Sequence, residues 1–462
     1  MTATIDLTET IDWPAYSPTE PTGLPHLTVI GTGYLGATHA VCMAALGFEV
    51  TGVDVDADKI ARLAAGEVPF YEPGLGELLT KALDSGRLRF TTDFAEAGRL
   101  GDVHFLCVGT PQAKGSDAAD MTYVRSAVRE LAQHLTRRTL VVGKSTVPVG
   151  TAAEMTALLQ ELAPAGDQVE LAWNPEFLRE GFAIEDTMTP DRLVFGVASA
   201  WAESMLRAAF EPVITEHATP VLVTDLHTAE LVKVAANSFL ATKISFINAM
   251  AEVCEVTGAD VSGLAKALSY DTRIGGRFLH PGLGFGGGCL PKDIRAFRHR
   301  AEELGAGPAV AFLGEVDAIN LRRRSRTVDL VRELAGGDLS GVRVAALGAA
   351  FKPNSDDIRD APALDVAASL QRAGAIVTVY DPAAMDNARR KFPELAYGTS
   401  AMDAAIDADV VVLLTEWVEF REIDPAALAA VVAQRNVVDG RHALNPVDWR
   451  AAGWTYRALG RP

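Results

Sequence analysis

Short apolar runs recur along the first half of the chain, and helix-like segments separate them. The runs are LTVI (27–30), FEVTGVD (48–54), VHFLCVG (103–109) and TLVVGKST (139–146). The first run leads into the glycine-rich GTGYLG and then into small and apolar residues as far as Leu46. Apolar runs that alternate with helical patterns are typical of a parallel sheet covered by helices. We therefore predict an α/β domain over residues 25–220.

The second half begins with a different pattern. Residues 221–257 contain neither glycine nor proline, and they carry a helical pattern well beyond the mean helix of about 11–12 residues. A helix of that length usually runs between domains or supports a subunit interface. Helical sequence continues to about residue 333, where apolar runs resume. These runs are VRVAALG (342–348), AIVTVYD (375–381), DVVVLLT (409–415) and NVVDG (436–440).

The pattern thus predicts an α/β protein with two doubly wound, Rossmann-like domains. An all-helical connector with a long central helix, residues 221–333, joins the first domain to the second, residues 334–462. Residues 1–24 precede both domains as a flexible tail, because Pro14, Pro18 and Pro21 punctuate a polar, acidic stretch. This tail lacks the basic start and apolar centre of a signal peptide.

Composition narrows the class of protein. The 462 residues are 48% hydrophobic and carry a formal net charge of −18, which argues against non-specific nucleic-acid binding. No uninterrupted apolar stretch of ~18 residues occurs, so we expect no membrane span. The four cysteines form no CxxC pair, which argues against a disulfide framework or a metal site and favours a cytoplasmic location.

The GTGYLG segment predicts a dinucleotide site. Gly31, Gly33 and Gly36 form GxGxxG between a strand and a helix, so the backbone can approach a pyrophosphate at the helix N-terminus. Asp54 ends the next strand, 18 residues after Gly36. A carboxylate there accepts from both ribose hydroxyls and repels a 2′-phosphate, so we expect NAD rather than NADP. The alternative is a solvated aspartate at a strand end.

The stretch PGLGFGGGCLPKD, residues 281–293, places five glycines around one cysteine. Such density costs conformational entropy and is hard to explain as packing, so we expect the backbone to approach a bulky ligand there. Cys289 is then a candidate nucleophile, with Lys292 or another cation lowering its pKa. The alternative is a small residue in a glycine-rich turn. Cys42, Cys107 and Cys254 stand in apolar contexts and are expected to be inert.

Two further pairs are spaced by four residues, so each pair shares one helix face if its segment is helical. Lys233 and Asn237 are a candidate oxyanion clamp, although a lysine in that position can also be a solvated surface residue. Glu176 and Glu180 stand in NPEFLREG, and a single carboxylate pair is weak evidence for a site.

Together, these segments resemble the UDP-glucose dehydrogenase family, more broadly the nucleotide-sugar 6-dehydrogenases. The match runs in order from about residue 27 to residue 442. Its elements are GTGYLG, VDVDADKI, EPGLGELL, VGTP, STVPVGT, NPEFLREGFAIED, AELVKVAANSFLATKISFIN, DTRIGGRFLHPGLGFGGGCLPKD, AFKPNSDDIRDAPAL, YDP, TEW and DGR. The resemblance implies two Rossmann-like domains and a long helix through which subunits pair, so we expect a homodimer or higher homo-oligomer acting on a nucleotide sugar.

The resemblance also implies roles for individual residues. The implied catalytic residues are the nucleophile Cys289, the oxyanion pair Lys233 and Asn237, and the groups that serve water and proton transfer, Asp293, Glu176 and Thr146. The implied NAD contacts are Gly31, Gly33, Tyr34, Leu35, Gly36, Asp54, Lys59, Thr110, Thr146, Glu180, Lys292 and Arg359. The implied nucleotide-sugar contacts are Phe177, Leu178, Glu180, Lys233, Asn237, Arg273, Phe278, Gly286, Phe351, Lys352 and Arg441.

Arg273 is expected to reach the site of the partner subunit, whereas the alternative is that it pairs with Asp271 of its own chain. The chain departs from the common family pattern at two positions. It has Gly288 where the family usually has serine, and it has His442 after DGR where the family usually has asparagine. Neither departure removes a catalytic group, but both leave the sugar preference open.

The implied reaction is a four-electron oxidation of C6 through a Cys289 thiohemiacetal and thioester, most simply of UDP-glucose to UDP-glucuronate. GDP-mannose or UDP-N-acetylhexosamine oxidation would use the same residues. A two-electron β-hydroxyacid dehydrogenase would leave Cys289 and the C-terminal domain without a purpose. A non-catalytic NAD sensor or scaffold is a further alternative, against which the retention of Cys289, Lys233, Asn237 and Asp293 argues.

Overall fold

The computed structural model describes residues 23–461, so the tail predicted for residues 1–24 lies outside the described residues except for its last two. The chain divides into two compact units, Met1–Ala235 and Ala236–Pro462. The division falls within the long helix α10 (Leu226–Thr257).

The first unit is built on one sheet whose strand order is β3-β2-β1-β4-β5-β6-β7-β8. The strands are β1 (Leu27–Ile30), β2 (Val50–Val53), β3 (Leu88–Thr91), β4 (Val103–Leu106), β5 (Thr139–Gly143), β6 (Val169–Trp173), β7 (Leu193–Gly196) and β8 (Val221–Thr224). The first six strands are parallel in the 3-2-1-4-5-6 order of dinucleotide-binding folds. Strand β7 pairs with β6 in the antiparallel direction, and β8 runs parallel to β7.

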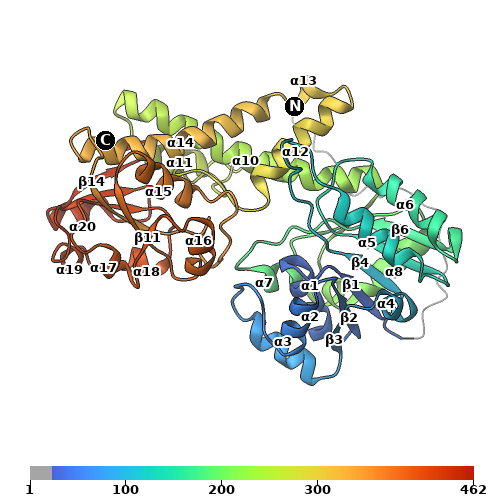
Figure 1. The fold of residues 1–462 in the computed structure, drawn as a ribbon. Coiled ribbons are helices and arrows are strands. Elements are labelled where there is room, and N and C mark those ends of the chain that lie inside the picture. The colour runs from blue at the N-terminus through green and yellow to red at the C-terminus, as the bar shows by residue number, and fades with distance from the viewer. Residues whose placement is uncertain (1–22, 462) are drawn as a thin grey trace. The chain divides into compact units, whose positions relative to one another are not determined.

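Helices accompany this sheet, as Figure 1 shows in blue and green. They are α1 (Tyr34–Ala45), α2 (Ala57–Ala64), α3 (Leu75–Asp84), α4 (Phe94–Leu100), α5 (Thr122–Ala132), α6 (Thr151–Leu162), α7 (Ala183–Met188), α8 (Ala200–Ala209) and α9 (Glu211–His217), with a 3₁₀ turn at Gly166–Gln168. Side chains alternate between the two faces of a strand. In β1, Leu27 and Val29 therefore enter one hydrophobic cluster and Ile30 enters the other. Both faces are buried, which explains the near-continuous apolar runs of the sequence.

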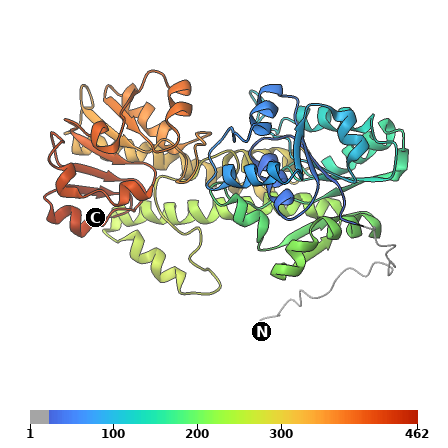
Figure 2. The ribbon, with the colours of Figure 1, turned by 90° about the horizontal axis from the view of Figure 1, so that it is seen from below.

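The second unit combines helices with a second sheet, whose strands are drawn in orange to red in Figures 1 and 2. Its helices after α10 are α11 (Val261–Ser269), α12 (Leu290–Glu303), α13 (Gly307–Val310), α14 (Phe312–Leu334), α15 (Pro362–Arg372), α16 (Met385–Lys391), α17 (Ala401–Ala404), α18 (Val418–Arg421), α19 (Pro425–Leu428) and α20 (Pro446–Ala451). Its strands are β9 (Arg343–Leu347), β10 (Ile376–Tyr380), β11 (Ala396–Tyr397), β12 (Val410–Leu413), β13 (Asn436–Asp439) and β14 (Thr455–Ala458).

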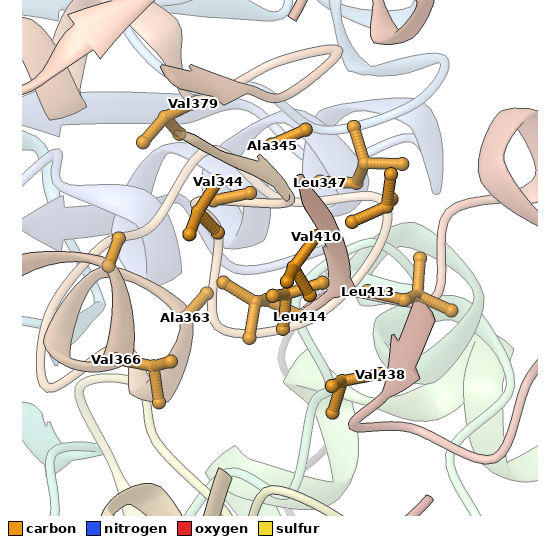
Figure 3. Close-up of a cluster of buried hydrophobic side chains, with 14 of the residues drawn as sticks. Val344, Ala345, Leu347, Ala363, Val366, Val379, Val410, Leu413, Leu414 and Val438 are labelled. Atoms are coloured by element: carbon orange, nitrogen blue, oxygen red, sulfur yellow. The ribbon is translucent and has the colours of Figure 1, made fainter. Parts of the chain in front are cut away.

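All strands of the second sheet are parallel, in the order β11-β10-β9-β12-β13-β14. This is again the 3-2-1-4-5-6 order. The core lies between the sheet and its covering helices. Figure 3 shows Val344 of β9 and Val410 of β12 with Ala363 and Val366 of α15 in that core, and all four are buried.

The predicted α/β fold is confirmed, and so is the long helix within residues 221–257, which spans Leu226–Thr257. One expectation is corrected: residues 221–224 do not belong to an all-helical connector but form β8, which pairs with β7. Among the described residues, no helix is both long enough and apolar enough to cross a membrane.

Candidate active site

The glycine-rich turn after β1 has the geometry that a dinucleotide loop requires. Gly31 has φ +90°, and a Cβ there would lie 2.8 Å from a Val108 methyl group. A Cβ on Gly36 would lie 1.8 Å from the Gly31 carbonyl oxygen, so no side chain fits at either position. A Cβ on Gly33 would meet nothing within 4 Å, and Gly33 caps α1 without a side-chain hydrogen bond. The helix N-terminus can therefore receive a pyrophosphate.

Asp54, at the end of β2, is held by donors from its own chain. Its Oδ2 accepts hydrogen bonds from the Thr32 backbone N–H (2.8 Å) and hydroxyl (3.1 Å) and from the Lys59 ammonium (2.9 Å), whereas Oδ1 accepts one from the Asp56 N–H (3.1 Å). Burial alone would raise the pKa of Asp54, but the Thr32 hydrogen bond and Lys59 outweigh burial and lower it. Asp54 is thus an ionised acceptor, buried rather than solvated at a strand end.

The loops after β4 and β5 are tied together at the carboxyl edge of the sheet, where ligands bind in open α/β folds. The Thr110 hydroxyl donates to the Thr146 carbonyl (2.8 Å), and the Ser145 hydroxyl donates to the Val108 carbonyl (2.6 Å). Thr110 and Thr146, both implied NAD contacts, therefore share one rigid corner.

Lys233 contacts Glu176 rather than solvent. Its ammonium lies 3.1 Å from the Glu176 carboxylate and 5.4 Å from the Phe177 ring centroid, and the lysine side chain is 6% exposed. Glu176 also accepts a hydrogen bond from the Leu178 backbone N–H (2.8 Å). The alternative of a solvated surface lysine is therefore wrong, and Lys233 helps to fix the loop that carries Glu176, Phe177 and Leu178.

A second buried lysine anchors the start of the same loop. The Lys144 ammonium donates to the Asn174 side-chain oxygen (2.8 Å), and the Asn174 amide donates to the Val194 carbonyl (2.9 Å). Burial lowers the pKa of Lys144. On α10, Glu230 accepts hydrogen bonds from the N–H groups of Gly150 (2.8 Å) and Ala152 (2.6 Å) and so holds the N-terminus of α6.

Cys289 differs from the other three cysteines by its exposure. It is exposed at the N-cap position of α12, a helix of 14 residues. A helix N-terminus stabilises a thiolate. Burial instead raises the pKa of the Cys42 and Cys107 thiols, each to about 12, and Cys254 is also buried. The expectation that these three are inert fits their surroundings.

One turn into α12, Asp293 is buried and bonded on both sides. The Asn237 side-chain amide donates to Asp293 (2.6 Å), and the Lys292 ammonium forms an ion pair with it. Asn237 is itself buried. The structure thus brings together Asn237, Asp293 and Lys292, with Cys289 at the start of the same helix.

The glycine density before Cys289 has a packing explanation, contrary to our expectation. A Cβ on Gly284 would lie 2.3 Å from the Asn320 side-chain oxygen, and one on Gly286 would lie 2.3 Å from the Asp360 carbonyl oxygen. A Cβ on Gly287 would lie 2.8 Å from the Phe351 ring, whereas a Cβ on Gly288 would meet only the guanidinium of Arg359, a largely exposed side chain that can move aside. The loop is glycine-rich because the protein itself approaches its backbone.

Three loops at the carboxyl edge of the second sheet are joined by Arg441. Its guanidinium donates to the carbonyls of Leu414 (2.8 Å), Gly284 (2.9 Å) and Phe351 (3.2 Å). Lys352 lies beside this edge with its ammonium 5.4 Å from the Phe351 ring centroid. Two further arginines pair with nearby acids of their own chain: Arg359 with Asp357 and Arg273 with Asp271. Phe278 has φ +64°.

The second sheet does not repeat the dinucleotide site of the first. Asp381 ends β10 at the position that Asp54 occupies in the first unit. Its two oxygens already accept from the N–H groups of Ala349, Ala350, Ala383 and Ala384 and from the Trp417 indole. A carboxylate with five donors has no acceptor site left for ribose hydroxyls.

Sequence reasoning missed several residues that organise these loops. Each stands in a quoted motif: Glu72 in EPGLGELL, Lys144 beside STVPVGT, Asn174 in NPEF and Glu230 in AELVK. Their polar character within apolar surroundings was the available signal, but their partners are remote in sequence.

The comparisons with known proteins agree with this organisation. Residues 25–214 match the NAD binding domain of the UDP-glucose/GDP-mannose dehydrogenase family, residues 227–322 its central domain and residues 345–446 its UDP binding domain. The chain is 42% identical to UDP-glucose 6-dehydrogenase of Rhizobium meliloti (strain 1021), over 94% of this chain and 99% of the relative. It is 41% identical to UDP-glucose 6-dehydrogenase TuaD of Bacillus subtilis (strain 168), over 94% and 93%.

A solved structure is also similar. A UDP-glucose dehydrogenase from the hyperthermophilic archaeon Pyrobaculum islandicum superposes with a TM-score of 0.87 at 37% identity, covering 97% of this chain and all of that chain. The match therefore extends over both sheets and the helices between them in sequence. The chain belongs to the UDP-glucose/GDP-mannose dehydrogenase family.

Proposed function

We propose that the protein oxidises UDP-glucose to UDP-glucuronate with NAD, in two successive two-electron steps at C6. The exposed Cys289 thiol at the N-terminus of α12, with the Asn237–Asp293 hydrogen bond one turn further along the same helix, carries the proposal. Relatives at about 40% identity over 94% of the chain are UDP-glucose 6-dehydrogenases, which favours this sugar over GDP-mannose and the UDP-N-acetylhexosamines.

NAD binding is assigned to the first sheet. The backbone around Gly33 and the N-terminus of α1 would receive the pyrophosphate, and Asp54 would accept from the ribose hydroxyls, with Lys59, Thr110, Thr146, Glu180, Lys292 and Arg359 as further contacts. NAD, when bound, accepts a hydride from C6 in each oxidation. The ionised Asp54 would repel the 2′-phosphate of NADP.

Cys289 supplies the covalent step between the two oxidations. Its thiolate adds to C6 of the aldehyde and forms a C–S bond, while the carbonyl oxygen becomes an oxyanion. Loss of a hydride from C6 then yields a thioester. Water adds to the thioester carbonyl, the C–S bond breaks, and Cys289 leaves as thiolate. The water supplies the second oxygen of the carboxylate.

The remaining catalytic residues stabilise the oxyanion, position the water and transfer protons. Lys233 and Asn237, four residues apart on α10, stabilise the oxyanion. Thr146 and Asp293 position the hydrolytic water, and Glu176 exchanges protons with it. Burial of Lys233, Asn237 and Asp293 supports these roles, because buried dipoles and charges act strongly where water is excluded. Phe177, Leu178, Phe278, Gly286, Phe351, Lys352 and Arg441 are assigned to the nucleotide sugar.

We also propose that the active form is a homodimer or a higher homo-oligomer. Phe239, Phe246 and Val253 follow one another at intervals of seven residues on α10, and all three are exposed. Two helical turns separate successive members, so the three residues form one apolar stripe, hereafter the α10 stripe. Such a stripe on a helix fits the same stripe of a second copy.

The experiment is a count of NADH formed per sugar consumed, with UDP-glucose, GDP-mannose and UDP-N-acetylglucosamine in parallel. We expect two NADH per UDP-glucose and uronic acid as the product. Cys289→Ser should abolish the acid while NAD binding persists, and the matched thiol control Cys254→Ser should retain the stoichiometry. One NADH per sugar, or acid formation by Cys289→Ser near the wild-type rate, would refute the thioester route. Faster turnover of another sugar would correct the substrate.

A further inference from the structure

Glu72 is a buried carboxylate to which the mechanism above gives no role. It stands in the turn before α3 and is 7% exposed. In the described part of the chain it has no lysine or arginine partner, and its charge is held by hydrogen-bond donors. Burying a carboxylate is costly unless donors satisfy it. The identity of those donors therefore indicates what the residue does.

The donors come from two loops that are remote in sequence. One is the Tyr34 hydroxyl, in the glycine-rich turn at the start of α1. The others are the backbone N–H groups of Gly181 (2.6 Å) and Ala183 (2.8 Å). Gly181 also donates to the Tyr34 hydroxyl oxygen (3.0 Å). Tyr34, Glu72, Gly181 and Ala183 form a closed cluster, hereafter the Glu72 clasp.

Each side of the Glu72 clasp adjoins residues assigned to a different ligand. Tyr34 belongs to the loop assigned to the pyrophosphate of NAD. Gly181 stands in the loop that carries Phe177 and Leu178, which are assigned to the nucleotide sugar, and it directly follows Glu180, which is implied in contacts with both ligands. Both oxygens of Glu72 are engaged, and the Tyr34 ring lies 4.9 Å from the Phe70 ring, which restricts its movement. Burial and then the Glu72 hydrogen bond raise the pKa of Tyr34, so its hydroxyl stays a donor.

We propose that Glu72 is a positioning residue that couples the dinucleotide loop to the nucleotide-sugar loop, so that each ligand strengthens the binding of the other. This inference rests on the proposed function for the identity of the sugar ligand. Ordering of one loop by its ligand holds the Tyr34 hydroxyl and the Gly181 N–H on the carboxylate, which pre-organises the other loop. Coupling of this kind is reciprocal.

The test measures the dissociation constant of NADH by fluorescence, with and without UDP-glucose, which cannot be oxidised without NAD. The variants are Glu72→Gln, Tyr34→Phe and their combination, and Glu77→Gln, an exposed glutamate on α3, is the matched control. In the wild type and the control we expect UDP-glucose to tighten NADH binding. In Glu72→Gln and Tyr34→Phe this tightening should fall by about tenfold, the size of one lost charge-assisted hydrogen bond.

The combined variant should lose no more coupling than Glu72→Gln alone, because the tyrosine acts through the carboxylate. A merely structural role would lower the melting temperature and leave the ratio of the two dissociation constants unchanged, and that result would overturn the proposal. A wild-type ratio of one would overturn it too. Failure of the proposed function would be seen separately, as UDP-glucose binding without turnover in the NADH count.

Discussion

The two carboxylate oxygens of Asp54 accept different numbers of hydrogen bonds. Its Oδ2 has the two Thr32 donors and the Lys59 ammonium, whereas Oδ1 has only the Asp56 N–H. A carboxylate offers about four acceptor positions, and Oδ1 therefore retains room for a ribose hydroxyl. Asp381 of the second sheet has no such room. This difference between two aspartates at equivalent strand ends is the reason to assign the dinucleotide to the first sheet alone.

Asp54→Asn should lower kcat/KM for NAD by about 10- to 100-fold, since hydrogen bonds to a charged group contribute about 1.5–3 kcal/mol. The same substitution removes the repulsion of a 2′-phosphate and releases the Lys59 ammonium to meet it. Use of NADP should therefore rise. Kinetics with both cofactors check this, with Asp58→Asn, an exposed acid on α2, as the control for lost charge. If the ratio of NAD to NADP kcat/KM stayed at the wild-type value, Asp54 would not select the cofactor.

Residue chemistry was read from the sequence in part. The GxGxxG spacing predicted a glycine-rich turn between a strand and a helix, and the positive φ of Gly31 and the close contact at Gly36 agree with that prediction. For the loop before Cys289 the same logic gave the wrong cause, because the atoms that crowd Gly284 and Gly286 belong to Asn320 and Asp360. A glycine that cannot be replaced indicates that other atoms lie close to its backbone. Composition alone does not reveal whether it is a ligand or the fold.

At the scale of the elements, buried strands were the easiest to predict. Both faces of β1, β4 and β12 are covered, so these strands appear in the sequence as near-continuous apolar runs. We did not predict β3, β6, β7, β8, β11 or β14. Strand β3 carries an exposed arginine and so has no continuous apolar run. Strand β8 has an apolar sequence, VLVT, but it directly precedes the long helix, and we assigned it to the helical connector. The antiparallel pairing of β7 has no local signal, because direction is decided by tertiary packing.

We expect the α10 stripe to be buried in a subunit interface. A large apolar side chain that is about half exposed on a helix is stabilised by burial against a partner, at roughly 25 cal/mol per Å². Phe246→Asp would place a charge in that interface. We expect sedimentation to show a shift from a multiple of the 49.1 kDa chain mass toward the monomer.

The control for this substitution is Val447→Asp, which changes an exposed apolar residue of α20 in the same way. It should leave the assembly unchanged. The proposal that α10 forms the subunit interface would be wrong if the wild-type chain sediments as a monomer. It would also be wrong if the Phe246→Asp variant assembles like the wild type.

The whole molecule carries a net charge of the same sign as its proposed ligands, so binding must depend on local positive features. NAD and nucleotide sugars are anions, whereas the chain carries a formal charge of −18. Attraction must therefore come from local features, such as the α1 N-terminus and individual lysines and arginines. Many of the described arginines are already paired within the chain, and Arg273 pairs with Asp271 two residues away. Its side chain is nevertheless 87% exposed, so a partner subunit could meet it without unfolding anything.

Arg273 is proposed to serve the site of the partner subunit, and mixed dimers test this. Arg273→Ala and Cys289→Ser should each be inactive alone. If the arginine acts in trans, a mixed dimer gathers both lesions in one site and leaves the other site whole. Statistical mixing of a symmetric dimer should then restore about a quarter of the wild-type activity. If the arginine serves its own chain, every site carries a lesion and nothing is restored.

The control mixture is Asn237→Ala with Cys289→Ser. Asn237 donates a hydrogen bond to Asp293 on α12, the helix that Cys289 caps, so Asn237 and Cys289 of one chain belong to the same site. In a mixed dimer each site then carries one lesion, and mixing should restore no activity. Exchange of subunits is verified by mass spectrometry of differently tagged chains. If verified mixed dimers of Arg273→Ala and Cys289→Ser stay inactive, Arg273 does not serve the partner's site. The same follows if the Arg273→Ala variant is fully active alone. In either case the only role left to Arg273 is its ion pair with Asp271.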